Sequence, residues 1–138
     1  MNARKLNAEK LNARKWNTRK TIWASVFGVA GVLHFAQPKF FDALVPRELP
    51  GGRRVWTHGS GVAELALSAG IVGTAFADSR RYDAAVATAA TAFLAGVWPG
   101  NIKMAWDWRT QSAIPRAIAF ARVPMQLPMM YSTWRLQE

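Results

Sequence analysis

The sequence contains no cysteine. This absence excludes disulfide bonds, thiolate metal sites and any redox relay or nucleophile that depends on a cysteine. Histidine is also scarce, with two residues in a chain of 138. Because His34 and His58 lie in different segments without a local ligand spacing, a hydrogen-bonding role is favoured over metal or haem ligation. No acid is expected behind either histidine, so a Ser-His-Asp triad is not predicted.

Acidic residues are few, with eight Asp and Glu against 18 Lys and Arg, and the formal net charge is +10. Residues 1–20 hold seven of the basic residues and only one acid, Glu9. Such a basic tail could meet nucleic acid or anionic lipid. Because an apolar segment follows it directly, the pattern favours anionic lipid headgroups on the cytoplasmic side of a membrane, and a nucleic-acid partner is disfavoured.

The tail is also repetitive, since residues 2–21 repeat a five-residue unit of the type Asn-Ala-Arg-Lys-Leu. A step of five residues places successive apolar positions about 140° apart around a helix, so they do not form one stripe. We therefore expect a solvated or weakly helical arm in front of a single domain at residues 21–138.

Long apolar segments dominate that domain, at residues 21–36, 55–77, 84–98 and 114–134. The second is the most continuous, and as a helix it measures about 34 Å, enough for a hydrocarbon layer of about 30 Å. The expected fold is therefore all-α, an integral membrane four-helix bundle. Small residues recur every four positions in the second and third segments, a spacing that lets helices approach closely in lipid.

Proline residues mark the expected breaks. Pro38 should end the first span, and a short interfacial helix with Phe40 and Phe41 on its apolar face should follow. Pro99 should end or kink the third span, and prolines in the fourth should kink it. Four spans place both termini on one side, and the bias of Lys and Arg favours the cytoplasm.

This topology converts sequence position into depth in the bilayer. Nearly every unusual polar residue falls in the outer half of the bundle, and the candidates for lining a cavity there are His34, Glu64, Asn101, Arg122 and Gln126. Glu64 and Arg122 each lie roughly 12–13 Å inside a helix end, so we expect them to form an ion pair. The pair could be purely structural, fixing helix register, or could also line a ligand cavity.

Four short runs carry a resemblance to a known family. The runs AGVLHF at 30–35, SGVAEL at 60–65, WPGNIKMA at 98–105 and RVPMQ at 122–126 resemble, in order and spacing, motifs of the DoxX family. This resemblance implies a four-helix bundle in the bacterial inner (plasma) membrane. It also implies that the characteristic polar positions of the family are His34, Glu64, Asn101, Arg122 and Gln126. The resemblance further implies a protein function linked to quinone and redox chemistry.

Two functions follow as expectations. The first is an accessory subunit of a respiratory or oxidative-stress membrane complex, with membrane proteins as partners. The second is a membrane oxidoreductase or binding protein for a quinone or lipid, which would use Glu64, Arg122 and His34. A soluble nucleic-acid binder rests on charge alone, because four apolar segments flanked by tryptophans are hard to explain in water.

Overall fold

The computed structural model describes residues 2–7 and 16–138, and within them every regular element is a helix. The all-α fold class is therefore confirmed. Residues 8–15, the middle of the basic repeat, lie outside the described residues. The principal elements are α2 Thr18–Ala36, α3 Pro38–Asp42, α4 Arg53–Gly73, α5 Arg80–Asp107, α6 Ala113–Trp134 and a 3-10 turn, η1, at Arg135–Gln137.

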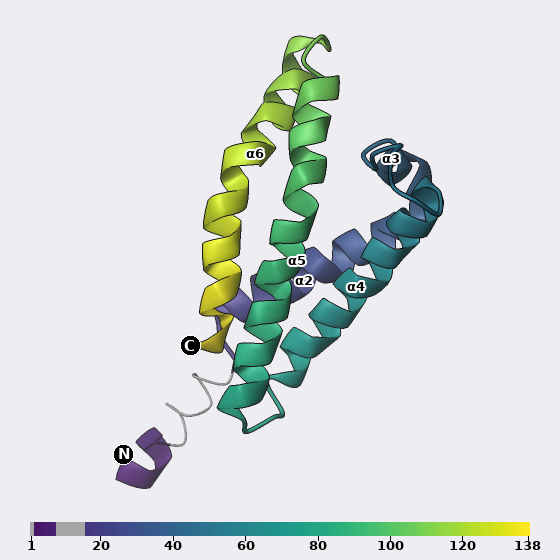
Figure 1. Cartoon of the computed structure of the whole chain (residues 1–138). Coiled ribbons are helices and arrows are strands. Elements are labelled where there is room, and N and C mark those ends of the chain that lie inside the picture. Colours follow the sequence, from purple (N-terminus) through teal and green to yellow (C-terminus); the bar gives the residue numbers. More distant parts are fainter. Residues whose placement is uncertain (1, 8–15) are drawn as a thin grey trace.

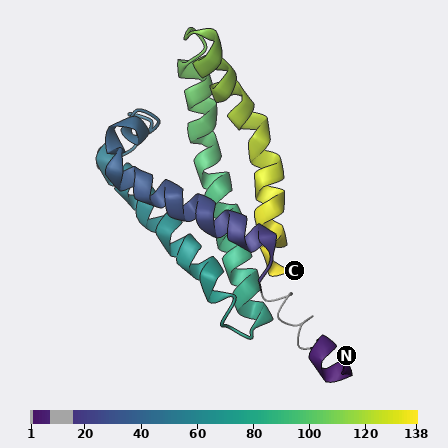
Figure 2. The same ribbon diagram turned by 180° about the vertical axis from the view of Figure 1, so that it is seen from behind.

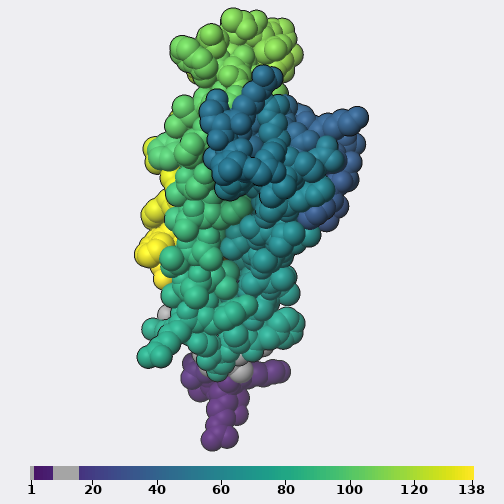
Figure 3. Space-filling model, turned by 45° about the vertical axis from the view of Figure 1, so that its right-hand side comes forward, coloured from purple at the N-terminus to yellow at the C-terminus, as the bar shows by residue number. Residues whose placement is uncertain are grey.

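The four long helices form two hairpins. Helix α2 packs along α4 and α5 packs along α6, whereas contact between the hairpins is sparser. Figures 1 and 2 show that the hairpins lie together near the chain termini and diverge toward the opposite end. At that end the turn between α5 and α6 projects beyond the α3 segment (Figure 3). The even number of long helices places the start of α2 and the C-terminus at the same end, as the sequence predicts.

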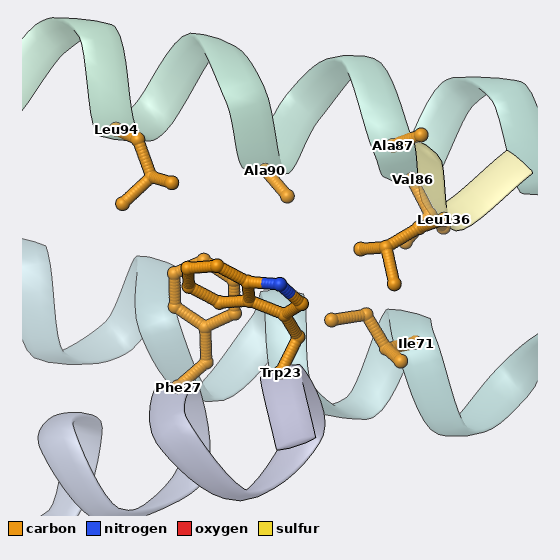
Figure 4. Close-up of a cluster of buried hydrophobic side chains, with 8 residues drawn as sticks. All are labelled: Trp23, Phe27, Ile71, Val86, Ala87, Ala90, Leu94 and Leu136. Carbon is orange, nitrogen blue, oxygen red and sulfur yellow. The ribbon is translucent and has the colours of Figure 1, made fainter. Parts of the chain in front are cut away.

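A cluster of apolar side chains joins the two hairpins where they meet (Figure 4). Trp23 and Phe27 of α2 are almost completely buried against Ile71 of α4 and Ala90 of α5. The Trp23 indole N–H donates to Ser132 Oγ on α6 at 2.9 Å. Because large aromatic side chains bury the most apolar area per residue, this cluster sets which end of the bundle is closed.

The structure begins its first long helix earlier than predicted. The side-chain oxygen of Asn17 caps the helix by accepting a hydrogen bond from the Lys20 backbone N–H at 3.0 Å, so α2 starts at Thr18. The expectation that Lys20 belongs to the solvated tail is therefore wrong. Its side chain is buried, and its ammonium lies 3.9 Å from Asp83 at the start of α5.

The third long helix does not end at Pro99. Helix α5 continues to Asp107, and Asn101, Met104 and Ala105 beyond the proline are all buried. A proline removes one backbone N–H from the helical ladder, but the packing of Met104 and Ala105 against Ala119 of α6 favours continuation. The predicted span at residues 84–98 is therefore too short at both ends.

The predicted short helix after the first span is present as α3, and a carboxylate fixes it to α4. Asp42 accepts hydrogen bonds from the Arg54 guanidinium at 2.8 and 3.0 Å and from the Thr57 hydroxyl at 2.7 Å. The hydrogen bonds from Arg54 and then Thr57 hold the pKa of Asp42 below its usual range.

The hydrogen bonds from Arg54 and Thr57 to Asp42 form a clamp between α3 and α4, and this clamp predicts a pH dependence of stability. A carboxyl group whose pKa is lower in the folded state than in the unfolded state stabilises the fold at pH values above its unfolded-state pKa. That stabilisation is lost as the pH falls through its folded-state pKa. We therefore expect the melting temperature in detergent to fall below about pH 4, where free aspartate begins to protonate. The variant Asp42→Asn should be less stable than the wild type at pH 7 and should lose less between pH 5 and pH 3. Equal pH profiles for the two proteins would show that the hydrogen bonds of Asp42 do not contribute to stability.

Many large apolar side chains are exposed on the outside of the bundle, and several polar side chains are buried inside it beside the apolar clusters. Exposed residues include Phe76, Ile114 and Val29, at 83%, 75% and 60% of their accessible area. Thr57 and Gln126, in contrast, are almost completely buried. By length and composition, one helix of the described residues, α5, is apolar enough to cross a membrane.

Candidate functional site

Two glycines bring α2 and α4 into close contact. A Cβ atom built on Gly61 would lie 2.8 Å from His34 Cβ, and one built on Gly31 would lie 3.0 Å from the Gly61 carbonyl oxygen. Only residues without a side chain fit this crossing. The contact places His34, near the end of α2, beside Glu64, one turn along α4 from Gly61.

Glu64 and His34 form the first buried polar cluster. His34 Nδ1 lies 2.9 Å from Glu64 Oε2 and 2.8 Å from the carbonyl oxygen of Ala30. Both side chains are about nine-tenths buried, and Oε2 has no hydrogen-bond donor. One ring nitrogen carries at most one hydrogen, and here it faces two acceptors. The carboxyl group is therefore placed to take up a proton or a further donor.

The α3 segment covers this cluster. The Phe41 ring stacks on the His34 ring with the centroids 3.7 Å apart and the planes 24° from parallel. The next residue is Asp42, whose bonds to α4 hold the aromatic ring in place. Phe41 thus packs against a site residue, whereas the sequence pattern assigned it to the membrane interface. Its neighbour Phe40 is exposed, as that pattern predicts.

The second cluster joins α5 to α6 through a chain of hydrogen bonds. Arg122 Nε and Nη2 donate to Asn101 Oδ1 at 3.2 and 3.1 Å. Asn101 Nδ2 donates to Gln126 Oε1 at 3.0 Å, and Gln126 Nε2 donates to the Leu94 carbonyl at 2.6 Å. Asn101 and Gln126 are buried, while Arg122 is exposed. This series of hydrogen bonds gives the side-chain amides of Asn101 and Gln126 both a donor and an acceptor, and it leaves the Arg122 guanidinium at the surface.

The five residues singled out from the sequence therefore form two clusters, one in each hairpin. Within the described residues Glu64 and Arg122 do not form the expected ion pair, because Glu64 contacts His34 and Arg122 donates to Asn101. The expectation that no acid lies behind either histidine is also wrong for His34. The tight crossing of α2 and α4 explains both differences, since it turns Glu64 toward its own hairpin.

An open groove runs between α4 and α5. Its larger part, about 500 Å³, is lined by four alanines and by Leu67, Gly70, Val86 and Phe93. A second part of about 350 Å³ extends to Trp56 near the start of α4 and shares Ala63 and Phe93 with the first. None of the five predicted residues lines either part. Ala66 and Gly70, from one of the rows of small residues that recur every four positions, thus border an open surface here.

Comparison with known proteins changes the family assignment. A family model described as a domain of unknown function (DUF8561) matches residues 23–137. The resemblance to the DoxX family is therefore wrong. Two of its four runs, AGVLHF and SGVAEL, consist mostly of small and aliphatic residues, a composition that apolar helices of many families share. No curated protein and no solved structure matches the chain.

Proposed function

We propose a function for this chain, which belongs to the DUF8561 family of domains of unknown function: it is a multi-span membrane protein that acts as an accessory subunit of a membrane complex. The observation that supports this most is the distribution of its side chains. Apolar residues such as Val29, Val62 and Ile114 are exposed, while Glu64, Asn101 and Gln126 are buried. Water-soluble proteins bury apolar residues and rarely expose large continuous apolar surfaces.

The lengths of the helices fit this proposal. Helices α2, α4 and α6 contain 19, 21 and 22 residues, or about 28 to 33 Å, and α5 is longer. A hydrocarbon layer of about 30 Å needs helices of this size. In such a layer the buried polar clusters remove costly groups from lipid, and the basic start of the chain lies beside the cytoplasmic headgroups.

An accessory role is favoured over a thiol-based or iron–sulfur redox role by the lack of cysteine. Without cysteine the chain has no thiolate ligand or nucleophile. The respiratory or oxidative-stress setting depended on the DoxX resemblance and falls with it. What supports association with another membrane protein is the surface, where small residues border an open groove between α4 and α5.

The decisive experiment is fractionation of the native membranes followed by analysis of the purified sample. We expect a tagged chain to resist extraction by alkaline carbonate, to dissolve in mild detergent, and to migrate in a native gel well above its 15.3 kDa. Release by carbonate would refute the membrane assignment. A carbonate-resistant chain that is always recovered alone would refute the accessory role.

Glu64 favours a second candidate function, the binding of a small amphipathic molecule such as a quinone or a lipid. Its buried Oε2 has no donor, and a ligand hydroxyl could supply one. The same purified sample tests this candidate by mass spectrometry of a lipid extract. A near-stoichiometric amphiphile that is lost in Glu64→Gln would support it, and retention of the molecule by that variant would exclude this carboxyl as its site.

A further inference from the structure

Arg122 occupies an unusual position on the outside of α6. It lies nine residues after Ala113 and twelve before Trp134, so it is at least about 13 Å from either end of the helix. Its side chain is exposed, and the residues one turn away on the same face, Ile118 and Met125, are exposed at 52% and 54%. A charged group at this depth is costly in lipid unless a partner neutralises it.

The chain itself supplies only a neutral acceptor for this charge. Arg122 Nε and Nη2 both donate to the amide oxygen of Asn101, and no carboxylate of the described residues lies within ion-pair distance. Asn101 is in turn fixed by Gln126, which bonds to the α5 backbone. This network holds the guanidinium in one orientation but leaves its charge uncompensated.

Among the described residues, a second copy of the chain offers no exposed carboxylate in the middle of a long helix. Apart from Glu64, the carboxylates of the described residues lie at helix ends or in loops: Asp42, Glu48, Asp78, Asp83, Asp107 and Glu138. Glu64 is at a comparable depth, but it is buried against His34 inside its own hairpin. The compensating acid therefore belongs to a different chain.

We propose that the α6 face formed by Ile114, Ile118, Arg122 and Met125 binds a transmembrane helix of another protein, and that an Asp or Glu near the middle of that helix pairs with Arg122. The four residues follow one another at intervals of four, four and three, which places them on one side of a helix. The proposal rests on the membrane function proposed above and specifies the chemistry of the partner.

The test uses a synthetic probe of defined chemistry. The full chain is reconstituted into phosphatidylcholine vesicles at pH 8, with a 22-residue leucine-rich transmembrane peptide that carries one Asp or one Asn at its centre. Energy transfer between labels on the two molecules measures association. We expect the Asp peptide to bind about tenfold more tightly than the Asn peptide, because only the Asp peptide can form an ion pair with Arg122.

Matched variants locate the effect. Arg122→Gln should reduce the preference for Asp to less than twofold, while Arg122→Lys should keep most of it. Arg116→Gln removes an exposed arginine near the start of α6 and should keep the full preference. Ile118→Trp should weaken both peptides, whereas Leu127→Trp, on the opposite side of α6, should weaken neither. A helical circular dichroism spectrum and a single gel-filtration peak establish that each variant is folded.

Three outcomes overturn the inference. The first is equal binding of both peptides, and the second is an Asp preference that survives Arg122→Gln. The third is energy transfer between copies of the chain that depends on Arg122, which would make the face a self-association surface. Flotation of the vesicles after a carbonate wash separates the two proposals. A chain that floats but shows no preference refutes only the role of Arg122, whereas a chain that does not float refutes the membrane function with it.

Discussion

Replacing Gly61 with leucine is expected to prevent α2 and α4 from packing as they do. A Cβ atom at this position would lie 2.8 Å from both His34 Cβ and the Phe35 ring, and 3.2 Å from the Gly31 carbonyl oxygen. His34 Cβ and the Gly31 carbonyl lie at the backbone, so the helices themselves must separate. Overpacking typically costs 1–3 kcal/mol, and a whole leucine at a helix crossing places the expected loss at about 3 kcal/mol or more.

Gly59 provides the matched control on the same helix. A Cβ atom there meets no atom within 4 Å, so Gly59→Leu should leave the melting temperature in detergent unchanged or raise it slightly, because leucine has the higher helix propensity. Thermal unfolding of the three proteins, followed by circular dichroism, measures the difference. Similar melting temperatures for Gly61→Leu and Gly59→Leu would contradict the tight crossing.

The second large effect is expected from Asn101→Leu. This substitution removes the acceptor of two Arg122 N–H groups and the donor to Gln126 Oε1. A buried polar group left without a partner costs about 1–3 kcal/mol, and hydrogen bonds to charged groups are worth more than neutral ones. We expect a loss of about 3 kcal/mol in the free energy of unfolding. Gln111→Leu, an amide replaced in an exposed turn, should change it little.

A double variant tests whether the network acts as a unit. In Asn101→Leu/Gln126→Leu the Gln126 oxygen is no longer present to be left without a donor. The combined loss should therefore be smaller than the sum of the two single losses by 0.5 kcal/mol or more, which is the range of coupling found for residues in direct contact. Strictly additive losses would indicate that the hydrogen bond between the two amides contributes nothing measurable.

Much of the helical framework could be predicted because local chemistry determines it. The first long helix ends at Ala36, next to Gln37 and Pro38, and α6 lies within one residue of the predicted segment at residues 114–134. Helix α5 does not end at Pro99 because a single lost backbone hydrogen bond is small beside the burial of Met104 and Ala105 beyond it. That burial depends on contacts with α6, which the residues on either side of the proline in the sequence do not reveal.

The partners of the site residues could not be predicted in the same way. The predicted topology gives the expected depth of a residue along a helix axis, and on that basis Glu64 and Arg122 are expected at a similar depth. It does not give the direction in which a side chain points. The contact between Gly31 and Gly61 fixes that direction and turns Glu64 toward His34. Ala66 and Gly70, which form another row of small residues in α4, gave an equally strong sequence signal, yet they border an open groove.

The grouping of polar residues by hairpin has a consequence for biosynthesis. In the first hairpin His34 and Glu64 face each other, and in the second Asn101, Arg122 and Gln126 bond to one another. These two clusters each form within one hairpin, whereas the buried Lys20 of α2 meets Asp83 of α5 only when the hairpins pack together. If the chain enters the bilayer as proposed, each hairpin can leave the translocation machinery with its own polar cluster already formed. The two hairpins can then associate after both have been inserted.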